Sequence, residues 1–265
     1  MRRFSIVAAL TVVALVSPIG RAGGTTPVLV ELFTSEGCSS CPAADTLLQS
    51  LVDTQPIDGA LVIALGHHVD YWDQLGWRDR FSSAASTNRQ QRYSQVMNVD
   101  SVYTPEMVVD GREEFVGSDA RAARRAIEKA AAAGHALVTI AVEPASGERL
   151  SAAVTVSDLP KVSRGDHPDV VVAVVENGLR SQVRGGENRG RVLVHAPVVR
   201  QMTTIGEATT ARLAADIAVA RDWQREHVTI VAFVQERVSR HVLGAAATPL
   251  QNARRPGPSV PGAVR

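Results

Sequence analysis

Val28-Leu-Val-Glu-Leu-Phe-Thr-Ser-Glu-Gly-Cys-Ser-Ser-Cys-Pro42 is the stretch of sequence that decides the expected fold. Its first six residues form a short, apolar run that includes β-branched side chains, which predicts a buried strand. Residues Thr34 to Gly37 predict a turn. After the cysteines, apolar side chains recur at helical spacing, so a helix is expected to begin in the cysteine region. The stretch therefore predicts a cysteine pair at the point where a strand ends and a helix begins.

Cys38 and Cys41 are the two cysteines of this 265-residue chain, and their position gives the pair a chemical meaning. Free backbone N–H groups and the positive end of the helix dipole stabilise a thiolate at a helix N-terminus. Cys38 is therefore expected to be the attacking thiol, and Cys41 the thiol that resolves a mixed disulfide. Ser39 and Ser40 can donate further hydrogen bonds to the thiolate. Pro42 falls in the first helical turn, where a missing N–H costs little.

Two structural explanations compete with this redox interpretation of the cysteine pair. An inert local disulfide is one, but a bridge between cysteines so close in sequence stabilises little through chain entropy. Half of a metal site is the other. Zinc needs about four ligands, and the sequence has no second cysteine pair. His67, His68 and Asp70 could complete such a site if their loop lies alongside the cysteines. We expect no resident metal and no cofactor.

The N-terminus has the layout of a secretory signal peptide. Arg2 and Arg3 form a positive region, Phe4 to Val16 an apolar region too short to span a bilayer, and Gly20 to Ala22 a cleavage site. Residues 1–22 are therefore expected to be removed, and an uncleaved membrane anchor is the alternative. The mature chain would work in an oxidising compartment, the bacterial periplasm or outside the cell, without membrane association. A formal net charge of +1 gives no electrostatic indication of nucleic-acid binding.

The pattern along the mature chain changes at Gly134. Before it, strands and helices alternate and an Asp-Gly hairpin follows, which predicts an α/β domain over residues 26–134. The expected strands are Val28–Phe33, Ala60–Leu65, Glu106–Asp110 and Arg112–Val116, and the expected helices follow the cysteines, cover Ala84–Met97 and follow Ser118. After Gly134, short apolar runs separated by turn residues predict a mostly antiparallel β-sandwich over residues 135–250. Residues 251–265 contain three prolines and are expected to form a disordered tail.

The element order resembles the thioredoxin fold. It runs strand, C-x-x-C, helix and strand, and then Val102-Tyr-Thr-Pro105 precedes a strand and a hairpin. In that family a cis-proline precedes the third strand and faces the cysteine pair, and Thr104-Pro105 matches this position. The resemblance implies that Pro105 shapes the groove in which an extended partner chain lies. The expected fold class is an α/β thioredoxin-like domain followed by a mostly antiparallel β-sandwich domain, α+β overall.

Longer motifs are similar to a secreted bacterial thioredoxin-like family known as domain of unknown function 1223. The motifs are Glu31–Pro42, His68–Asp73, Gly76-Trp77, Tyr103–Pro105, Gly186–Arg191, Val198–Arg200 and Leu243–Ala246. The resemblance implies a fold and no established substrate. Glu36-Gly37 stand where thioredoxins usually carry a tryptophan before the first cysteine. This departure changes the docking surface and argues against a general disulfide-reductase role.

Polar residues near the cysteines are expected to support the site. Glu31, seven residues before Cys38, could accept a proton from the resolving thiol if burial raises its pKa. An edge-exposed glutamate is the alternative. His68 and Asp70 follow the second strand, at the carboxyl edge of the sheet where the cysteine turn also lies, and a histidinium there would stabilise a thiolate. Alternatively, aromatic side chains fix this loop and its histidines are merely hydrogen-bonded, the role expected for His67.

The leading functional hypothesis is a periplasmic thiol–disulfide oxidoreductase that acts on a protein thiol or disulfide. One alternative is a binding module whose disulfide is structural. The other is metal handling through the cysteine pair and His68. The glycine-rich segment Arg184–Arg191 lacks the context of a phosphate loop, so it is expected to be a solvated turn or a contact with the redox domain. Whether the protein is an enzyme, its substrate, the redox direction and the oligomeric state stay open at this stage.

Overall fold

The computed structural model describes residues 24–144, 149–208 and 212–250, which form thirteen strands, three α-helices and one 3-10 helix. In chain order the elements are β1 (Thr26–Thr34), α1 (Cys41–Thr54), β2 (Ala60–His68), α2 (Ala84–Met97), β3 (Glu106–Val109), β4 (Glu113–Val116), α3 (Ala120–Ala131), β5 (Leu137–Pro144), β6 (Arg149–Ser157), β7 (Pro168–Glu176), β8 (Arg180–Gln182), β9 (Val192–Val194), β10 (Val198–Glu207), β11 (Leu213–Ala218), the 3-10 helix η1 (Arg225–His227), β12 (Val228–Glu236) and β13 (Val242–Pro249). The predicted signal peptide and the predicted tail lie outside the described residues. None of the described helices has the length and apolar character needed to cross a membrane.

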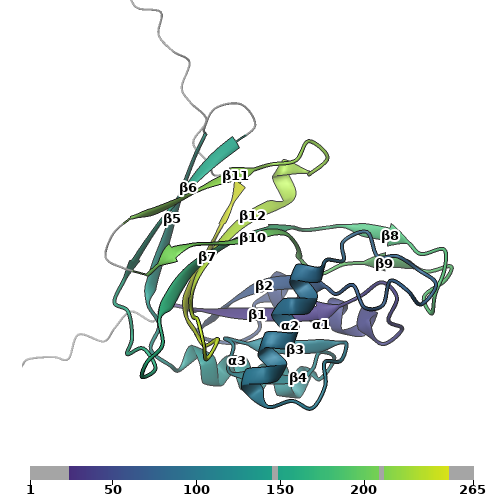
Figure 1. Ribbon diagram of the computed structural model, residues 1–265, viewed down its shortest axis with the longest axis horizontal. Helices are drawn as coiled ribbons and strands as arrows, with labels where there is room; N and C mark the ends of the chain where they lie inside the picture. The colour runs from purple at the N-terminus through teal and green to yellow at the C-terminus, as the bar shows by residue number, and fades with distance from the viewer. Residues whose placement is uncertain (1–23, 145–148, 209–211, 251–265) are drawn as a thin grey trace, which may run out of the picture.

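One large sheet joins the two halves of the chain. Its eight strands run in the order β13-β12-β7-β10-β2-β1-β3-β4, and a three-stranded sheet β11-β6-β5 and the hairpin β8-β9 accompany it (Figure 1). The halves meet where β10 pairs in parallel with β2, with Val198 opposite Gly66. Gly66 is required at this junction because a Cβ atom there would lie 2.8 Å from the carbonyl oxygen of Pro197. The Gly66 N–H donates a hydrogen bond to that same oxygen at 2.6 Å.

The expected fold class, an α/β thioredoxin-like domain followed by a separate β-sandwich, is wrong. The protein is mostly β, and strands from the second half extend the sheet of the first half. The physical reason lies in β7 and β12, which are buried on both faces. One face packs against the three-stranded sheet and the other against Leu29, Ile63 and Leu65 of β1 and β2. Near-continuous apolar runs are typical of strands covered on both sides, whereas a sandwich strand alternates.

The two faces of β1 and β2 provide different surroundings, which decides where each candidate residue lies. Even-numbered side chains such as Val30 and Leu32 pack against α1 and α3 in one core. Odd-numbered side chains point the other way, and Phe33 packs against Tyr93 of α2. Because successive side chains in a strand alternate between faces, Glu31 and His67 share the α2 side, and Thr34 and His68 share the α1 side.

Local sequence signals explain where the helices begin. The side chains of Ser83 and Asp119 accept hydrogen bonds from backbone N–H groups in the first turns of α2 and α3, as N-cap residues do. The predicted bounds of α2, Ala84–Met97, are confirmed. At α1, Pro42 occupies the first turn and Ser40 is the N-cap residue, but its side chain makes no capping bond with the described residues. The Ser40 hydroxyl is therefore available for another partner.

Candidate functional site

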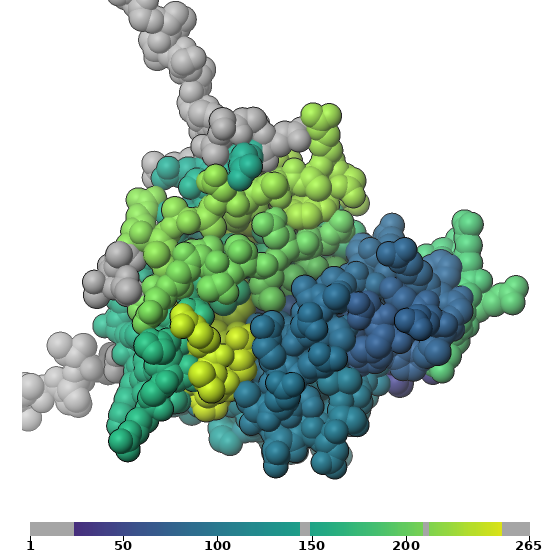
Figure 2. All heavy atoms as spheres, in the orientation of Figure 1, coloured from purple at the N-terminus to yellow at the C-terminus, as the bar shows by residue number. Residues whose placement is uncertain are grey.

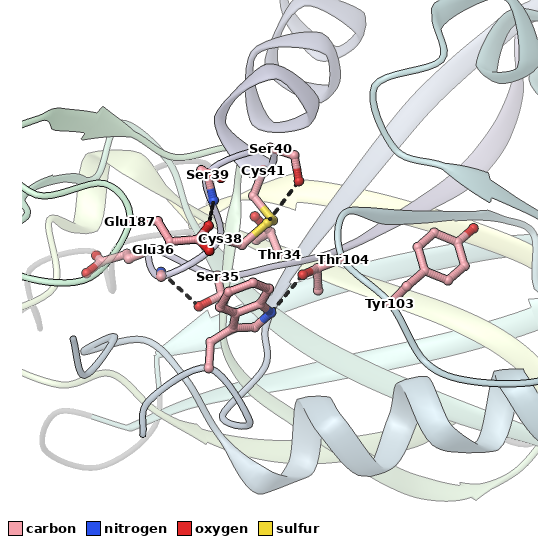
Figure 3. Close-up of a disulfide and its surroundings, with 12 residues drawn as sticks. Thr34, Ser35, Glu36, Cys38, Ser39, Ser40, Cys41, Tyr103, Thr104 and Glu187 are labelled. Carbon is pink, nitrogen blue, oxygen red and sulfur yellow. Dashed lines mark hydrogen bonds between the residues drawn. A yellow bond between two sulfur atoms is a disulfide. The ribbon is translucent and has the colours of Figure 1, made fainter. Parts of the chain in front are cut away.

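A disulfide joins Cys38 and Cys41 at the start of α1 (Figure 3). The sulfur atoms are 2.07 Å apart, and the Cys41 N–H donates a hydrogen bond to the Cys38 carbonyl oxygen at 3.3 Å. Each cysteine is only 1% exposed, whereas Ser39 and Ser40 between them are exposed. The outer side of the turn is thus open to solvent, while both cysteines are buried.

The hydroxyl of Ser40 faces the first cysteine. Its Oγ atom lies 3.4 Å from Cys38 Sγ, at the N-terminus of α1. A hydroxyl in this place can donate to a thiolate on Cys38 when the disulfide is reduced. Ser39 has a different partner: its backbone N–H donates a hydrogen bond to Glu187 Oε2 at 2.9 Å (Figure 3).

A loop from the second half of the chain clamps the cysteine turn. It belongs to the hairpin β8-β9, which projects at the right edge of the molecule in Figure 2. The fully buried Asn188 donates hydrogen bonds to the carbonyl oxygens of Glu36, at 2.9 Å, and Cys38, at 2.8 Å. Arg191 donates to Asn188 Oδ1 at 2.7 Å and fixes the amide. Of the two expectations for segment Arg184–Arg191, the contact with the cysteine region is therefore the one observed.

Trp72, from the loop after β2, packs against the turn at Gly37. Its indole N–H donates to Thr104 Oγ1 at 2.8 Å (Figure 3), and a Cβ atom at Gly37 would lie 3.2 Å from Trp72 Cβ. Glycine at position 37 thus lets the tryptophan approach the turn. The Thr104–Pro105 peptide bond is cis, as predicted. Pro105 lies near the first turns of α1, because a Cβ atom at Gly117 would contact both Pro105 and Ala44.

Glu31 has a different role from the one expected. It is buried on the α2 side of the sheet, where Arg89 and Tyr93 donate hydrogen bonds to its carboxylate and His67 Nε2 lies 2.9 Å away. Burial alone would raise its pKa, but the charge of Arg89 and the hydrogen bonds from His67 and Arg89 outweigh burial, so the pKa of Glu31 is strongly lowered. Neither the expected raised pKa nor the alternative of an exposed edge residue is observed, and an acid held ionised is a poor proton acceptor.

Asp70 also makes other contacts than expected. Its carboxylate accepts a hydrogen bond from Thr87 Oγ1 of α2 at 2.5 Å, which fixes the start of the loop after β2 to this helix. The arrangement fits the alternative in which this loop is held in place structurally. His67 has the structural role expected for it, since its ring stacks on Phe33 and pairs with Glu31.

His68 lies on the α1 side, in a buried polar cluster with Asp45, Asp79, His195 and Glu36. His68 Nδ1 lies 2.6 Å from Asp79 Oδ2, and the rings of His68 and His195 meet edge to face at 5.0 Å. His195 Nε2 lies 3.3 Å from Glu36 Oε1. Burial opposes the protonation of His68, but the carboxylates of Asp79, Asp45 and Glu36 outweigh it and raise the pKa of His68.

The side chains of Glu36 and Asp79 stay ionised in this cluster. For Glu36, burial favours the neutral acid, but hydrogen bonds with His195, Ser181 and Trp77 prevail and lower its pKa. For Asp79, burial is likewise outweighed, here by His68 and by the backbone N–H groups of Glu36 and Phe81, and the pKa is lowered. Both side chains are therefore carboxylates at neutral pH.

Glu106, next to Pro105, is a second buried acid of unusual character. Its side chain lies at the start of β3 and accepts a hydrogen bond from Gln90 Nε2 at 2.6 Å. Burial and the nearby charges of Glu114 and Glu31 raise the pKa of Glu106 to about 7, against the hydrogen bond from Gln90. Sequence reasoning did not identify this residue, although an acid at the first position of a buried strand beside a proline was visible as a signal.

Other residues of the site carry no local sequence signal. Asn188 and His195 reach the cysteine region only because the hairpin β8-β9 folds back onto α1. Gly185 permits the close approach of this loop, since a Cβ atom there would lie 2.2 Å from the carbonyl oxygen of Gly76. Asp45 follows Cys41 by one helical turn and accepts a hydrogen bond from Thr34 Oγ1 at 2.8 Å.

The fold and site define a mostly β protein with a disulfide-closed Cys-x-x-Cys turn at a helix N-terminus. Over residues 29–235 the chain matches the family described as "Protein of unknown function (DUF1223)", and it belongs to this family. No curated protein matches it.

Solved structures share the architecture. An X-ray crystal structure of a protein from Agrobacterium tumefaciens is similar with a TM-score of 0.63 and 24% identity, covering 88% of this chain and 98% of that chain. HBP35 of Porphyromonas gingivalis is similar with a TM-score of 0.64 and 14% identity, covering 91% of this chain and 80% of that chain. At these identities the likeness shows the fold alone.

Proposed function

We propose that the Cys38–Cys41 pair carries out thiol–disulfide exchange with a protein partner, in the bacterial periplasm or outside the cell. The observation that carries the proposal is the place of the disulfide: at the first turn of α1, with the Ser40 hydroxyl 3.4 Å from Cys38 Sγ. The positive end of the helix dipole and a hydroxyl donor both stabilise a thiolate on Cys38. A purely structural bridge has no need of either.

The exchange begins from the oxidised pair. A thiolate of the partner attacks Cys38 Sγ, which forms a mixed disulfide and breaks the bond to Cys41, and Cys41 leaves as a thiolate that takes up a proton. A second thiolate of the partner then attacks the partner's own sulfur in the mixed disulfide and releases Cys38 as a thiolate. The partner has lost two electrons and gained a disulfide, and the pair has been reduced. The reverse sequence reduces a partner disulfide, and the relative reduction potentials decide which direction prevails.

Exposed apolar side chains near the hairpin support a protein as the partner. Leu75 is 60% exposed, and Val192 and Val194 on β9 are 59% and 47% exposed. The carbonyl oxygen of Leu75 lies near Gly186, in the same hairpin loop as Asn188, which contacts the cysteine turn. Exposed large apolar side chains on and near the hairpin suit contact with another protein.

A second candidate, a binding module with a structural disulfide, is favoured by the burial of the sulfur atoms. Both cysteines are 1% exposed, and Asn188 fixes the backbone of the turn through two hydrogen bonds. Such a protein would bind its partner through the hairpin region and keep the pair oxidised.

A trapping experiment separates the two candidates. Cys41→Ser leaves Cys38 without its resolving thiol, so exchange predicts mixed disulfides that survive denaturation and dissolve on reduction. Cys38→Ser is the matched control, because it keeps one thiol but removes the attacking one. Adducts with Cys41→Ser and few with Cys38→Ser support exchange. Equal adduct formation, or none while partner binding persists, supports the binding module.

A further inference from the structure

The polar cluster on the α1 side of the sheet holds more acids than bases. Asp45, Glu36 and Asp79 provide three carboxylates, and His68 and His195 are the two imidazoles in contact with them; each residue is at most 5% exposed. Imidazole nitrogens and carboxylate oxygens gathered in one buried cluster are ligand types that first-row transition metals bind.

Two atoms in the cluster are poorly satisfied: Glu36 Oε1 has only the 3.3 Å contact with His195 Nε2, and His68 Nε2 has no hydrogen-bond partner among the described residues. Both belong to buried side chains, 1% and 2% exposed. The opposite ring nitrogen of His68, Nδ1, is paired with Asp79 Oδ2 at 2.6 Å. When Nδ1 carries the proton toward that carboxylate, Nε2 presents a free lone pair to the interior of the cluster. A carboxylate–imidazole pair of this kind is how metal-binding histidines are usually oriented.

We propose that Asp45, His68 and His195 bind one divalent first-row transition-metal ion of the zinc type. One ligand atom from each of these residues lies within 4.8 Å of the other two, and all three residues are buried. Ligands of one tetrahedral zinc ion lie roughly 3.3 Å apart, given bond lengths near 2 Å, so small side-chain rotations close the site. Two imidazoles and a carboxylate are a ligand set for zinc and its neighbours rather than for Ca²⁺ or Mg²⁺.

The remaining members of the cluster have clear places around the ion. Asp79 orients His68 through its hydrogen bond to Nδ1. Glu36 lies outside the group of mutually close ligand atoms, but its Oε1 lies 3.3 Å from His195 Nε2, so it is placed to orient His195 rather than to bind the ion. The ion would fasten three elements that are far apart in sequence: α1 through Asp45, β2 through His68, and the segment between β9 and β10 through His195. It would thereby hold the hairpin against the cysteine turn.

The site is distinct from the cysteine pair, and the test makes use of that. The full-length chain, produced without a histidine tag and with its disulfide intact, is stripped of metal and titrated with Co²⁺ and Zn²⁺. We expect one ion per chain, visible ligand-field absorption from nitrogen- and oxygen-bound Co²⁺, no sulfur-to-cobalt charge transfer, and a higher Tm with Zn²⁺. No stoichiometric ion in the wild-type chain overturns the proposal, as does a thiolate signature that appears only after reduction.

Variants assign the ligands. His68→Asn and Asp45→Asn, which each remove a proposed ligand, are expected to weaken Co²⁺ binding at least 100-fold. Asp79→Asn, which removes the carboxylate that orients His68, is expected to weaken it about 10- to 100-fold. His167→Asn, at an exposed histidine paired with Glu207, is the matched control and should bind like the wild type. Unchanged affinity in both ligand variants contradicts the assignment. Near-ultraviolet circular dichroism identifies any variant that has failed to fold, and the wild-type titration decides the question independently of them.

Discussion

The side-chain amide of Asn188 donates a hydrogen bond of 2.8 Å to the carbonyl oxygen of Cys38, across 150 residues of sequence. A second bond from the same amide reaches the carbonyl oxygen of Glu36. The backbone around the first cysteine is therefore held by the second half of the chain. Since Asn188 is fully buried, neither carbonyl group can turn to solvent for a partner without moving the loop.

Asn188→Ala should loosen this turn. Buried carbonyl groups that lose their donor cost about 1–3 kcal/mol, so we expect the free energy of unfolding to fall by about 2 kcal/mol. We also expect dithiothreitol to reduce the Cys38–Cys41 disulfide several-fold faster than in the wild type. Arg189→Ala, an exposed position in the same loop, is the control and should change stability by less than about 0.5 kcal/mol. Unchanged reduction kinetics in Asn188→Ala would show that the clamp does not limit access.

Ser40→Ala should make Cys38 less reactive. A hydrogen bond to a charged group is worth about 1.5 kcal/mol, close to a tenfold change in an equilibrium. In the reduced protein we therefore expect alkylation of Cys38 at pH 7 to slow about tenfold. Ser39→Ala is the control, because Ser39 bonds to Glu187 and not to the sulfur. Equal alkylation rates in Ser40→Ala and Ser39→Ala would show that Ser40 does not stabilise the Cys38 thiolate.

Glu31→Gln should be strongly destabilising. It leaves the guanidinium of Arg89 buried without its counter-charge, which typically costs about 3–5 kcal/mol. Lys129→Ala breaks an exposed ion pair with Glu113 and should cost less than about 1 kcal/mol. Urea denaturation measures both.

The pH dependence of stability gives a second check on Glu31. Its pKa is lowered in the folded protein, so the folded state holds the negative charge to lower pH than the unfolded state does. The ion pair between Glu31 and Arg89 therefore stabilises the protein fully at pH values above the ordinary glutamate pKa of 4.5. This contribution is lost as the pH falls below that value. We expect a flatter acid limb in Glu31→Gln than in the wild type. Parallel curves would contradict the ion-pair assignment.

The pKa of Glu106 gives stability a pH dependence opposite to that from Glu31, and Glu106→Gln should remove it. The pKa of Glu106 rises from 4.5 to about 7 on folding, so the folded protein keeps this proton where the unfolded chain has lost it. Wild-type stability then declines as the pH rises from about 5 to 8, by roughly 2–3 kcal/mol from this group. Glutamine avoids the loss and can still accept from Gln90. Chemical denaturation at pH 5 and pH 8 should show that Glu106→Gln becomes more stable relative to the wild type as the pH rises. The control variant Glu128→Gln, at an exposed position, should show no such change in relative stability.

The sequence was sufficient to predict most elements but not how they assemble. Apolar runs predicted the buried strands β1 and β2, and the Ser118-Asp119 cap predicted α3, because those signals are local. The pairing of β10 with β2 at Gly66 depends on two segments that are far apart in the chain. Strand β13 was not expected, since its Gly-Ala-Ala-Ala core has low strand propensity. It forms because it pairs with β12, and Gly244 allows the close approach of Ala136.

The candidate site shows the same division. Spacing and context pointed to Cys38 and Cys41, and the resemblance to the thioredoxin fold pointed to Pro105. Strand alternation could have shown that Glu31 and Thr34 point to opposite faces, but only the structure shows which face α1 covers. The recruitment of Asn188 and His195 depends on how the hairpin folds back, which no local pattern encodes.

The reduction potential of the Cys38–Cys41 pair, equilibrated against glutathione, tests the central claim most directly. Known thiol–disulfide catalysts cover roughly −120 to −230 mV, and exchange by this protein predicts a value in that range. A potential below about −300 mV, typical of structural disulfides, would contradict exchange and leave a binding module with a permanent bridge.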